Sequence, residues 1–77
     1  MSETAEKLIH LAAKKFRVNG KTLAPEDDLF KKLSINSIQA LELLSELEME
    51  FCVEVPDYEL QGVKTFGQLA AVIDRRK

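Results

Sequence analysis

The most constraining feature of this sequence is a long amphipathic stretch in its middle, preceded by a residue suited to start a helix. Asn36 is a good N-cap, and Gln39, three residues later, completes a capping box. At about 100° per residue, the apolar side chains of this stretch gather on one broad face. They are Ala40, Leu43, Leu44, Leu47 and Phe51, with Leu41 at the margin. The pattern predicts a helix from Ser37 to Phe51 with this face in the core.

Ser37 falls at the first position of the predicted helix. Its small hydroxyl side chain is expected to be exposed, beside backbone N–H groups that have no partner within the helix. These amides and the helix dipole favour a negative group at this end. Position alone does not identify a function, because small hydroxylated residues start many helices. Ser37 is therefore a candidate for carrying an anionic group, with a plain helix-starting role as the alternative.

The opposite face of the same helix carries apolar residues among polar ones. Ile38 and Met49 lie almost opposite the core face, with Glu42 and Ser45 close to them in direction. Exposed apolar side chains beside carboxylates are typical of a recognition surface. The alternative is a scatter of surface hydrophobes, which soluble proteins commonly have.

The N-terminal half predicts a first helix followed by an anchored loop. Ser2 or Thr4 can cap the helix, and Asn19-Gly20 is expected to stop it. The loop over residues 21–35 contains an acidic turn at 25–28 that lacks the pattern of a calcium site. The helix buries a stripe of Ala5, Leu8, Ile9, Ala12 and Phe16, and the loop is held by Leu29, Phe30, Leu33 and Ile35, with Leu29–Leu33 as a short helical turn.

The C-terminal part predicts a connection, a short turn and a last helix. Residues 52–56 alternate like a strand but have no partner strand, so we expect an extended connection in which Cys52 packs as a small apolar residue. Asp57 can cap one turn through Gln61. Thr65 and Gln68 form a second capping box, and the last helix buries Phe66, Leu69, Ala70 and Ile73. The predicted fold is all-α: one domain, residues 1–77, with three main helices and one short helix.

Charge and composition exclude several classes of function. Lysine and arginine number 11 against 13 aspartates and glutamates, so nucleic acid is not an expected partner. One histidine, expected at the surface as His10, and one cysteine give no metal cluster, disulfide or catalytic set. The chain is therefore not expected to be an enzyme. Acidic residues gather on the central helix and basic ones near the ends of the outer helices, which favours a basic protein partner.

The sequence shows neither a membrane-spanning segment nor a secretory signal. No apolar run is long enough for a membrane-spanning helix, and the N-terminus lacks the apolar core of a secretory signal. We expect a cytoplasmic protein that acts as a monomer.

The central segments resemble those of the acyl carrier protein family. The similarity rests on residues 33–38, 42–43, 47–51 and 53–57, and it extends over nearly the whole length. In that family an Asp-Ser-Leu triplet opens the second helix of a four-helix bundle, and its serine carries 4'-phosphopantetheine. The resemblance implies covalent attachment at Ser37, with Asn36 and Ile38 in the places of the aspartate and leucine. Ser34 is the rival serine.

The resemblance also implies a function and partners. The carrier would hold acyl intermediates as thioesters and present them to enzymes of fatty-acid, lipid or polyketide synthesis. It would be modified by a phosphopantetheinyl transferase and would dock on basic patches of acyl-processing enzymes. Its neutral Asn36 and its net charge of -2 favour a specialised bacterial member. The alternatives are an aminoacyl or peptidyl carrier, and a helical interaction module without a prosthetic group. The expected partner-binding residues are Asn36, Ile38, Glu42, Glu46 and Met49.

Overall fold

Four α-helices and two 3-10 turns make up the computed structural model, which describes residues 3–77. In chain order they are α1 (Glu3–Phe16), η1 (Gly20–Thr22), α2 (Leu29–Leu33), α3 (Ser37–Phe51), η2 (Asp57–Leu60) and α4 (Phe66–Arg76). No β-strand forms within the described residues; a single isolated bridge pairs Asp28 with Thr65. The predicted all-α class is confirmed, as is the span of the central helix.

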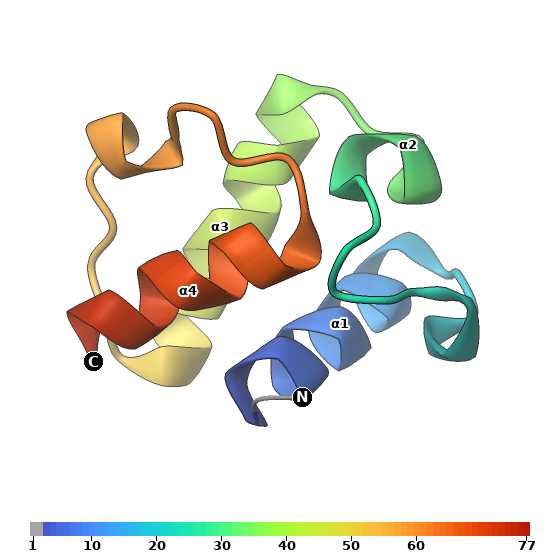
Figure 1. Ribbon diagram of the computed structural model, residues 1–77, viewed down its shortest axis with the longest axis horizontal. Helices are drawn as coiled ribbons and strands as arrows, with labels where there is room; N and C mark the ends of the chain where they lie inside the picture. The colour runs from blue at the N-terminus through green and yellow to red at the C-terminus, as the bar shows by residue number, and fades with distance from the viewer. Residues whose placement is uncertain (1–2) are drawn as a thin grey trace.

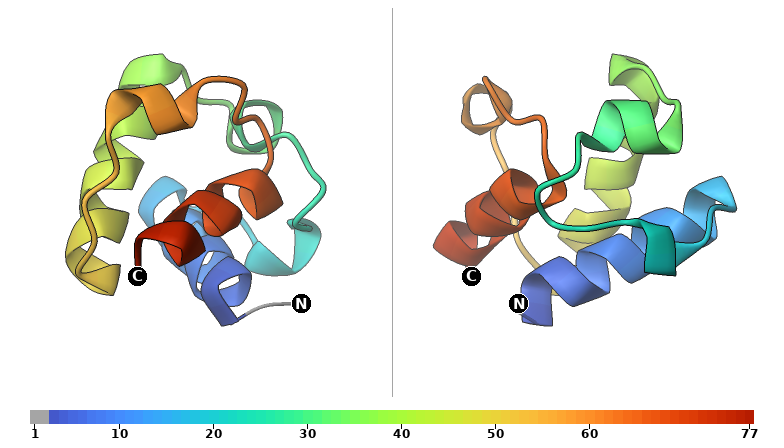
Figure 2. Two further views of the ribbon diagram at one scale, coloured as in Figure 1. Left: turned by 60° about the vertical axis from the view of Figure 1, so that its left-hand side comes forward. Right: turned by 45° about the vertical axis from the view of Figure 1, so that its right-hand side comes forward.

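The core lies between α1, α3 and α4 (Figure 1). Figures 1 and 2 place α2, η2 and the start of α3 together at one end of the bundle, and the ends of α3 and α4 at the other. The largest fully buried side chains are Leu8, Leu43, Leu47, Phe66 and Ile73. They come from the three predicted apolar faces, because each long helix can bury its stripe only against the other two.

Side chains cap α2, α3 and α4 at their starts. In α3, the Asn36 side chain accepts from the Gln39 N–H at 2.9 Å and the Asn36 N–H donates to Gln39 Oε1 at 3.0 Å. Thr65 and Gln68 form the same reciprocal pair at the start of α4. Both capping boxes were predicted, and both are confirmed. Asp28 caps α2, since its carboxylate accepts from the N–H groups of the following turn.

The ends of α1 differ from the prediction. Ser2 lies outside the described residues, and Thr4 is not a cap: it is buried within the helix, where its hydroxyl donates to Asp74 and accepts from Lys77. The helix stops at Phe16, before the Asn19-Gly20 pair that was expected to stop it. Arg17 takes a left-handed conformation (φ 57°), which lets the Val18 N–H bond the Ala13 carbonyl at 3.0 Å.

Cys52 was predicted to pack as a small apolar residue, and this is wrong. Like Arg17 at the end of α1, it ends α3 in a left-handed conformation. Its left-handed backbone (φ 55°) turns the chain, so that its side chain is exposed while the following Val53 is buried. Ser34 closes α2 in the same way, again with φ 55°. The first three α-helices therefore each end with a non-glycine residue in the left-handed region.

The loop before α2 is tied to the start of α4 by backbone hydrogen bonds. The Leu29 N–H donates to the Lys64 carbonyl, and the Gly67 N–H donates to the Pro25 carbonyl, both at 2.8 Å. The predicted apolar anchors are confirmed: Leu29 and Leu33 are buried, and Phe30 and Ile35 pack against the core. Within the acidic turn, Asp27 accepts from the Ala24 N–H. No group of histidine, cysteine or acidic residues in the described part of the chain is arranged to hold a metal ion.

The connection over residues 52–56 forms no strand, as predicted, but it begins with the turn at Cys52, so only residues 53–56 continue it without regular structure. It is fastened to α3 because the Val55 N–H donates to the Glu48 carboxylate at 2.8 Å. The next turn, η2, begins at Asp57 and ends at Leu60. Asp57 is therefore not its cap as predicted. Pro56 takes that position, and no side chain caps the turn. Among residues 3–77, no helix combines the length and the apolar character needed to cross a membrane.

Candidate functional site

Ser37 is the first residue of α3 and is exposed, at the end of the bundle where α2 and η2 also lie. The neighbouring Asn36 caps this helix: its side chain accepts a hydrogen bond from the Gln39 N–H, and its carbonyl accepts one from the Ala40 N–H. None of the side-chain hydrogen bonds formed within residues 3–77 involves the Ser37 hydroxyl. The hydroxyl oxygen is therefore accessible for reaction, and the helix start does not depend on it.

A largely apolar cavity of about 300 Å³ opens beside Ser37. Its walls come from α2, α3, η2, the loop after η2 and α4. Polar side chains on the cavity lining are few: Ser37, Asp57 and Gln61. A group attached to Ser37 therefore has an apolar space within reach. Sequence reasoning missed this cavity, because the apolar residues around it come from elements far apart in the chain.

The predicted recognition strip lies on the surface. Ile38 is 69% exposed and Met49 is 75% exposed, so both large apolar side chains face solvent. Asn36 and Glu42 are exposed as well. Ile38, Glu42 and Met49 thus lie on the outer side of α3, away from Leu43 and Leu47, and Asn36 is exposed at the start of the helix. Their contact with a partner stays a prediction.

Glu46 and Glu48, two of the acidic residues on α3, have partners inside the molecule. The Glu46 carboxylate lies 3.0 Å from the Lys15 ammonium group of α1, although Glu46 was expected to face a partner protein. Glu48 holds the Val55 N–H and so stabilises the connection after α3. Glu42 and Glu50 are exposed and form no ion pair with any other described residue. The helix therefore presents less negative charge than its sequence suggests.

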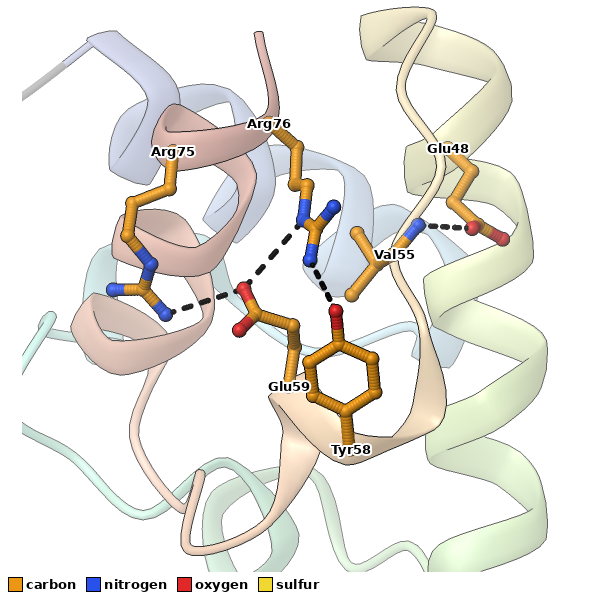
Figure 3. Close-up of polar contacts among 6 residues, drawn as sticks. All are labelled: Glu48, Val55, Tyr58, Glu59, Arg75 and Arg76. Carbon is orange, nitrogen blue, oxygen red and sulfur yellow. Dashed lines mark hydrogen bonds and ion pairs between the residues drawn. The ribbon is translucent and has the colours of Figure 1, made fainter.

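The basic end of α4 also has internal partners (Figure 3). The Glu59 carboxylate of η2 lies 3.5 Å from Arg75 and 3.6 Å from Arg76. Arg76 Nη2 donates to the Tyr58 hydroxyl at 3.1 Å. This hydrogen bond, together with the negative charge of Glu59, raises the pKa of the Arg76 guanidinium above its ordinary value. The Arg76 guanidinium therefore stays charged throughout the neutral pH range.

Comparison with known proteins finds one family along nearly the whole chain. The family model described as "Phosphopantetheine attachment site" matches residues 6–73. An acyl carrier protein of Thermosynechococcus vestitus is 32% identical over 75 residues, covering 97% of this chain and 93% of the relative. Acyl carrier proteins of Porphyromonas gingivalis and Helicobacter hepaticus are 31% and 28% identical over the same length, with 96% and 99% of each relative covered.

These matches define a class of protein: a carrier with a covalently attached 4'-phosphopantetheine group. The chain belongs to the acyl carrier protein family, as its sequence motifs predicted.

Proposed function

We propose that Ser37 is the residue that carries 4'-phosphopantetheine. Two observations support this assignment. The hydroxyl is exposed and takes no part in capping α3. It also sits at a helix start, where N–H groups without intrahelical partners and the helix dipole favour the negative phosphate that attachment brings. Ser34 fits less well, because it ends α2 in a left-handed conformation and has no helix start beside it.

The apolar cavity beside Ser37 is the observation that supports an acyl group as the cargo. When attached, the prosthetic group supplies a flexible arm whose thiol holds the cargo as a thioester. Burial of an apolar acyl chain away from water is favourable by about 0.8 kcal/mol for each CH₂ group. A cavity of about 300 Å³ with few polar side chains suits such a chain better than a charged aminoacyl group. We therefore place acyl cargo ahead of aminoacyl or peptidyl cargo.

The same proposal assigns the chain a passive chemical role. Its own residues orient the attachment site and offer a docking surface, while partner enzymes perform the reactions. Tethering raises the effective concentration of the cargo at each partner's active site. We propose that the partners are a phosphopantetheinyl transferase and acyl-processing enzymes with basic patches, and that the chain works as a monomer. The exposed unpaired thiol of Cys52 fits a reducing compartment such as the cytoplasm.

The docking surface in this proposal comprises exposed side chains on α3 around Ser37. Ile38 and Met49 supply apolar contact, and Glu42 supplies negative charge. Glu46 contributes less than its position suggests, since Lys15 neutralises it. Asn36 lies next to the modified residue, where a transferase must approach.

Mass spectrometry after co-expression with a phosphopantetheinyl transferase tests the assignment. The wild-type protein and a Ser34→Ala variant should gain the full mass of the phosphopantetheine group. Ser37→Ala should gain none, and its helical circular dichroism should match that of the wild type, because Asn36 provides the cap. If Ser37→Ala is still modified, the site lies elsewhere. A wild-type protein that is never modified would favour the interaction module without a prosthetic group.

A further inference from the structure

One wall of the apolar cavity is a weakly supported segment of the chain. Asp57 and Leu60 of η2, with Gln61 and Val63 after it, line the cavity together with residues of α2, α3 and α4. The turn η2 is only four residues long, and no side chain caps it. A single 3-10 turn of this kind has poor intrinsic stability. Its position must therefore depend on contacts with the rest of the molecule.

Two side chains of η2 that do not line the cavity reach α4 (Figure 3). Glu59 lies between the guanidinium groups of Arg75 and Arg76, and the hydroxyl of Tyr58 accepts from Arg76. The Glu59 side chain is only 19% exposed, so water screens these contacts less than those of a fully exposed pair. We call Tyr58, Glu59, Arg75 and Arg76 the η2 clamp.

Two adjacent residues of η2 thus face different parts of the molecule. Leu60 contributes to the cavity wall, while Glu59 before it is bound to α4. Movement of Glu59 away from the arginines would shift Leu60 and Gln61 with it, because Leu60 belongs to the same short turn and Gln61 follows it directly. The clamp therefore connects this wall to α4.

We propose that the η2 clamp holds one wall of the cavity in place and so determines how well the carrier shelters an apolar cargo chain. The statement about cargo rests on the proposed function, namely attachment of the arm at Ser37 with the acyl chain in the cavity. The statement that the clamp holds the wall does not depend on the proposed function. A loosened clamp leaves the fold intact, because Tyr58 and Arg75 are exposed and the core faces of α1, α3 and α4 lie elsewhere.

Hydrogen–deuterium exchange on the unmodified protein tests the wall. Glu59→Gln keeps the size of the side chain but removes the charge that both arginines bind. The amides of residues 59, 61 and 63, which bond carbonyls of Pro56, Tyr58 and Leu60, should exchange about three- to tenfold faster in this variant. Amides in the middle of α1 and α3 should not change. The matched control is Glu54→Gln, which removes the same charge from an exposed site in the preceding connection and should leave all these rates as in the wild type.

A second measurement tests the effect on cargo. Each variant is loaded with an octanoyl or an acetyl group, and cleavage of the thioester by hydroxylamine is followed by mass spectrometry. Octanoyl cleavage should be about three- to tenfold faster in Glu59→Gln than in the wild type and in Glu54→Gln. Acetyl cleavage should be the same in all three proteins, because two carbons are too few to benefit from the cavity.

Each outcome decides one part of the proposal. Unchanged exchange at residues 59–63 in Glu59→Gln would overturn the clamp, whatever the cargo result. Faster exchange with unchanged octanoyl cleavage would overturn the link between the clamp and the cargo. If no arm attaches to Ser37, the proposed function fails and takes the cargo part with it, while the exchange rates still decide whether the clamp holds the wall.

Discussion

The ammonium group of Lys15 lies 3.0 Å from the carboxylate of Glu46, so an ion pair joins α1 to the acidic helix α3. This pair reduces the negative field of the proposed docking surface. The Lys15 side chain is 27% exposed and the Glu46 side chain 51% exposed, so the pair contributes little to stability, roughly 0–1 kcal/mol. Its larger effect is on charge at the surface.

Replacing Lys15 should therefore make α3 a better target for a basic partner. Lys15→Gln is expected to raise the rate of modification by a phosphopantetheinyl transferase about two- to fivefold at low salt, with little effect at high salt. The control is Lys14→Gln, which changes the net charge equally at an exposed neighbouring position that forms no ion pair among residues 3–77. Equal acceleration in both variants would show that only net charge matters.

The exposed apolar residues of α3 should matter for binding and not for folding. Ile38→Ala and Met49→Ala are each expected to lower the free energy of unfolding by less than about 1 kcal/mol, because both side chains face solvent. The fully buried Leu47 is the reference: Leu47→Ala should cost about 2–5 kcal/mol. Urea denaturation gives the stabilities, and the KM for a transferase gives the binding effect. A large loss of stability in both surface variants would remove the recognition argument.

Asn36 should influence partner choice through charge. Asn36→Asp preserves the acceptor for the Gln39 N–H, and Asn and Asp are about equally good N-caps. The free energy of unfolding should therefore change by only a few tenths of a kcal/mol, slightly in favour of aspartate through the helix dipole. A carboxylate beside Ser37 adds attraction for a basic enzyme surface.

We expect Asn36→Asp to be modified faster by a transferase that serves a housekeeping carrier, most clearly at low ionic strength. Initial rates against salt concentration are the measurement, with thermal melting as the control for stability. Equal initial rates at low salt would leave Asn36 as a helix cap only.

Helices, capping boxes and the core could be predicted from the sequence because each depends on local spacing. The Asn36–Gln39 and Thr65–Gln68 pairs lie three residues apart and act within one turn. The apolar stripe of α4 likewise needs only the helical period. The helical period also predicted that Ile38 is exposed and Leu47 is buried, and both predictions are confirmed.

Features that depend on two distant segments could not be predicted. Charge pattern alone did not pair Glu46 with Lys15, or Glu59 with Arg75 and Arg76. The cavity beside Ser37 has the same origin, since its walls converge only after folding. Cys52 was assigned by its apolar character, but its place at the end of α3 gave it a left-handed backbone and an exposed side chain. Chain geometry at helix ends outweighed side-chain preference there.

The left-handed residues at the ends of α1, α2 and α3 have a consequence for the unfolded chain. A glycine at Arg17, Ser34 or Cys52 would relieve strain of about 1 kcal/mol or more in the folded state. It would also widen the range of backbone conformations open to the unfolded chain, which costs folding roughly 0.4–1 kcal/mol of entropy at each site. The two effects are of similar size and opposite sign. The non-glycine residues at these three helix ends therefore cost the protein little net stability, because they restrict the unfolded chain as well as straining the folded one.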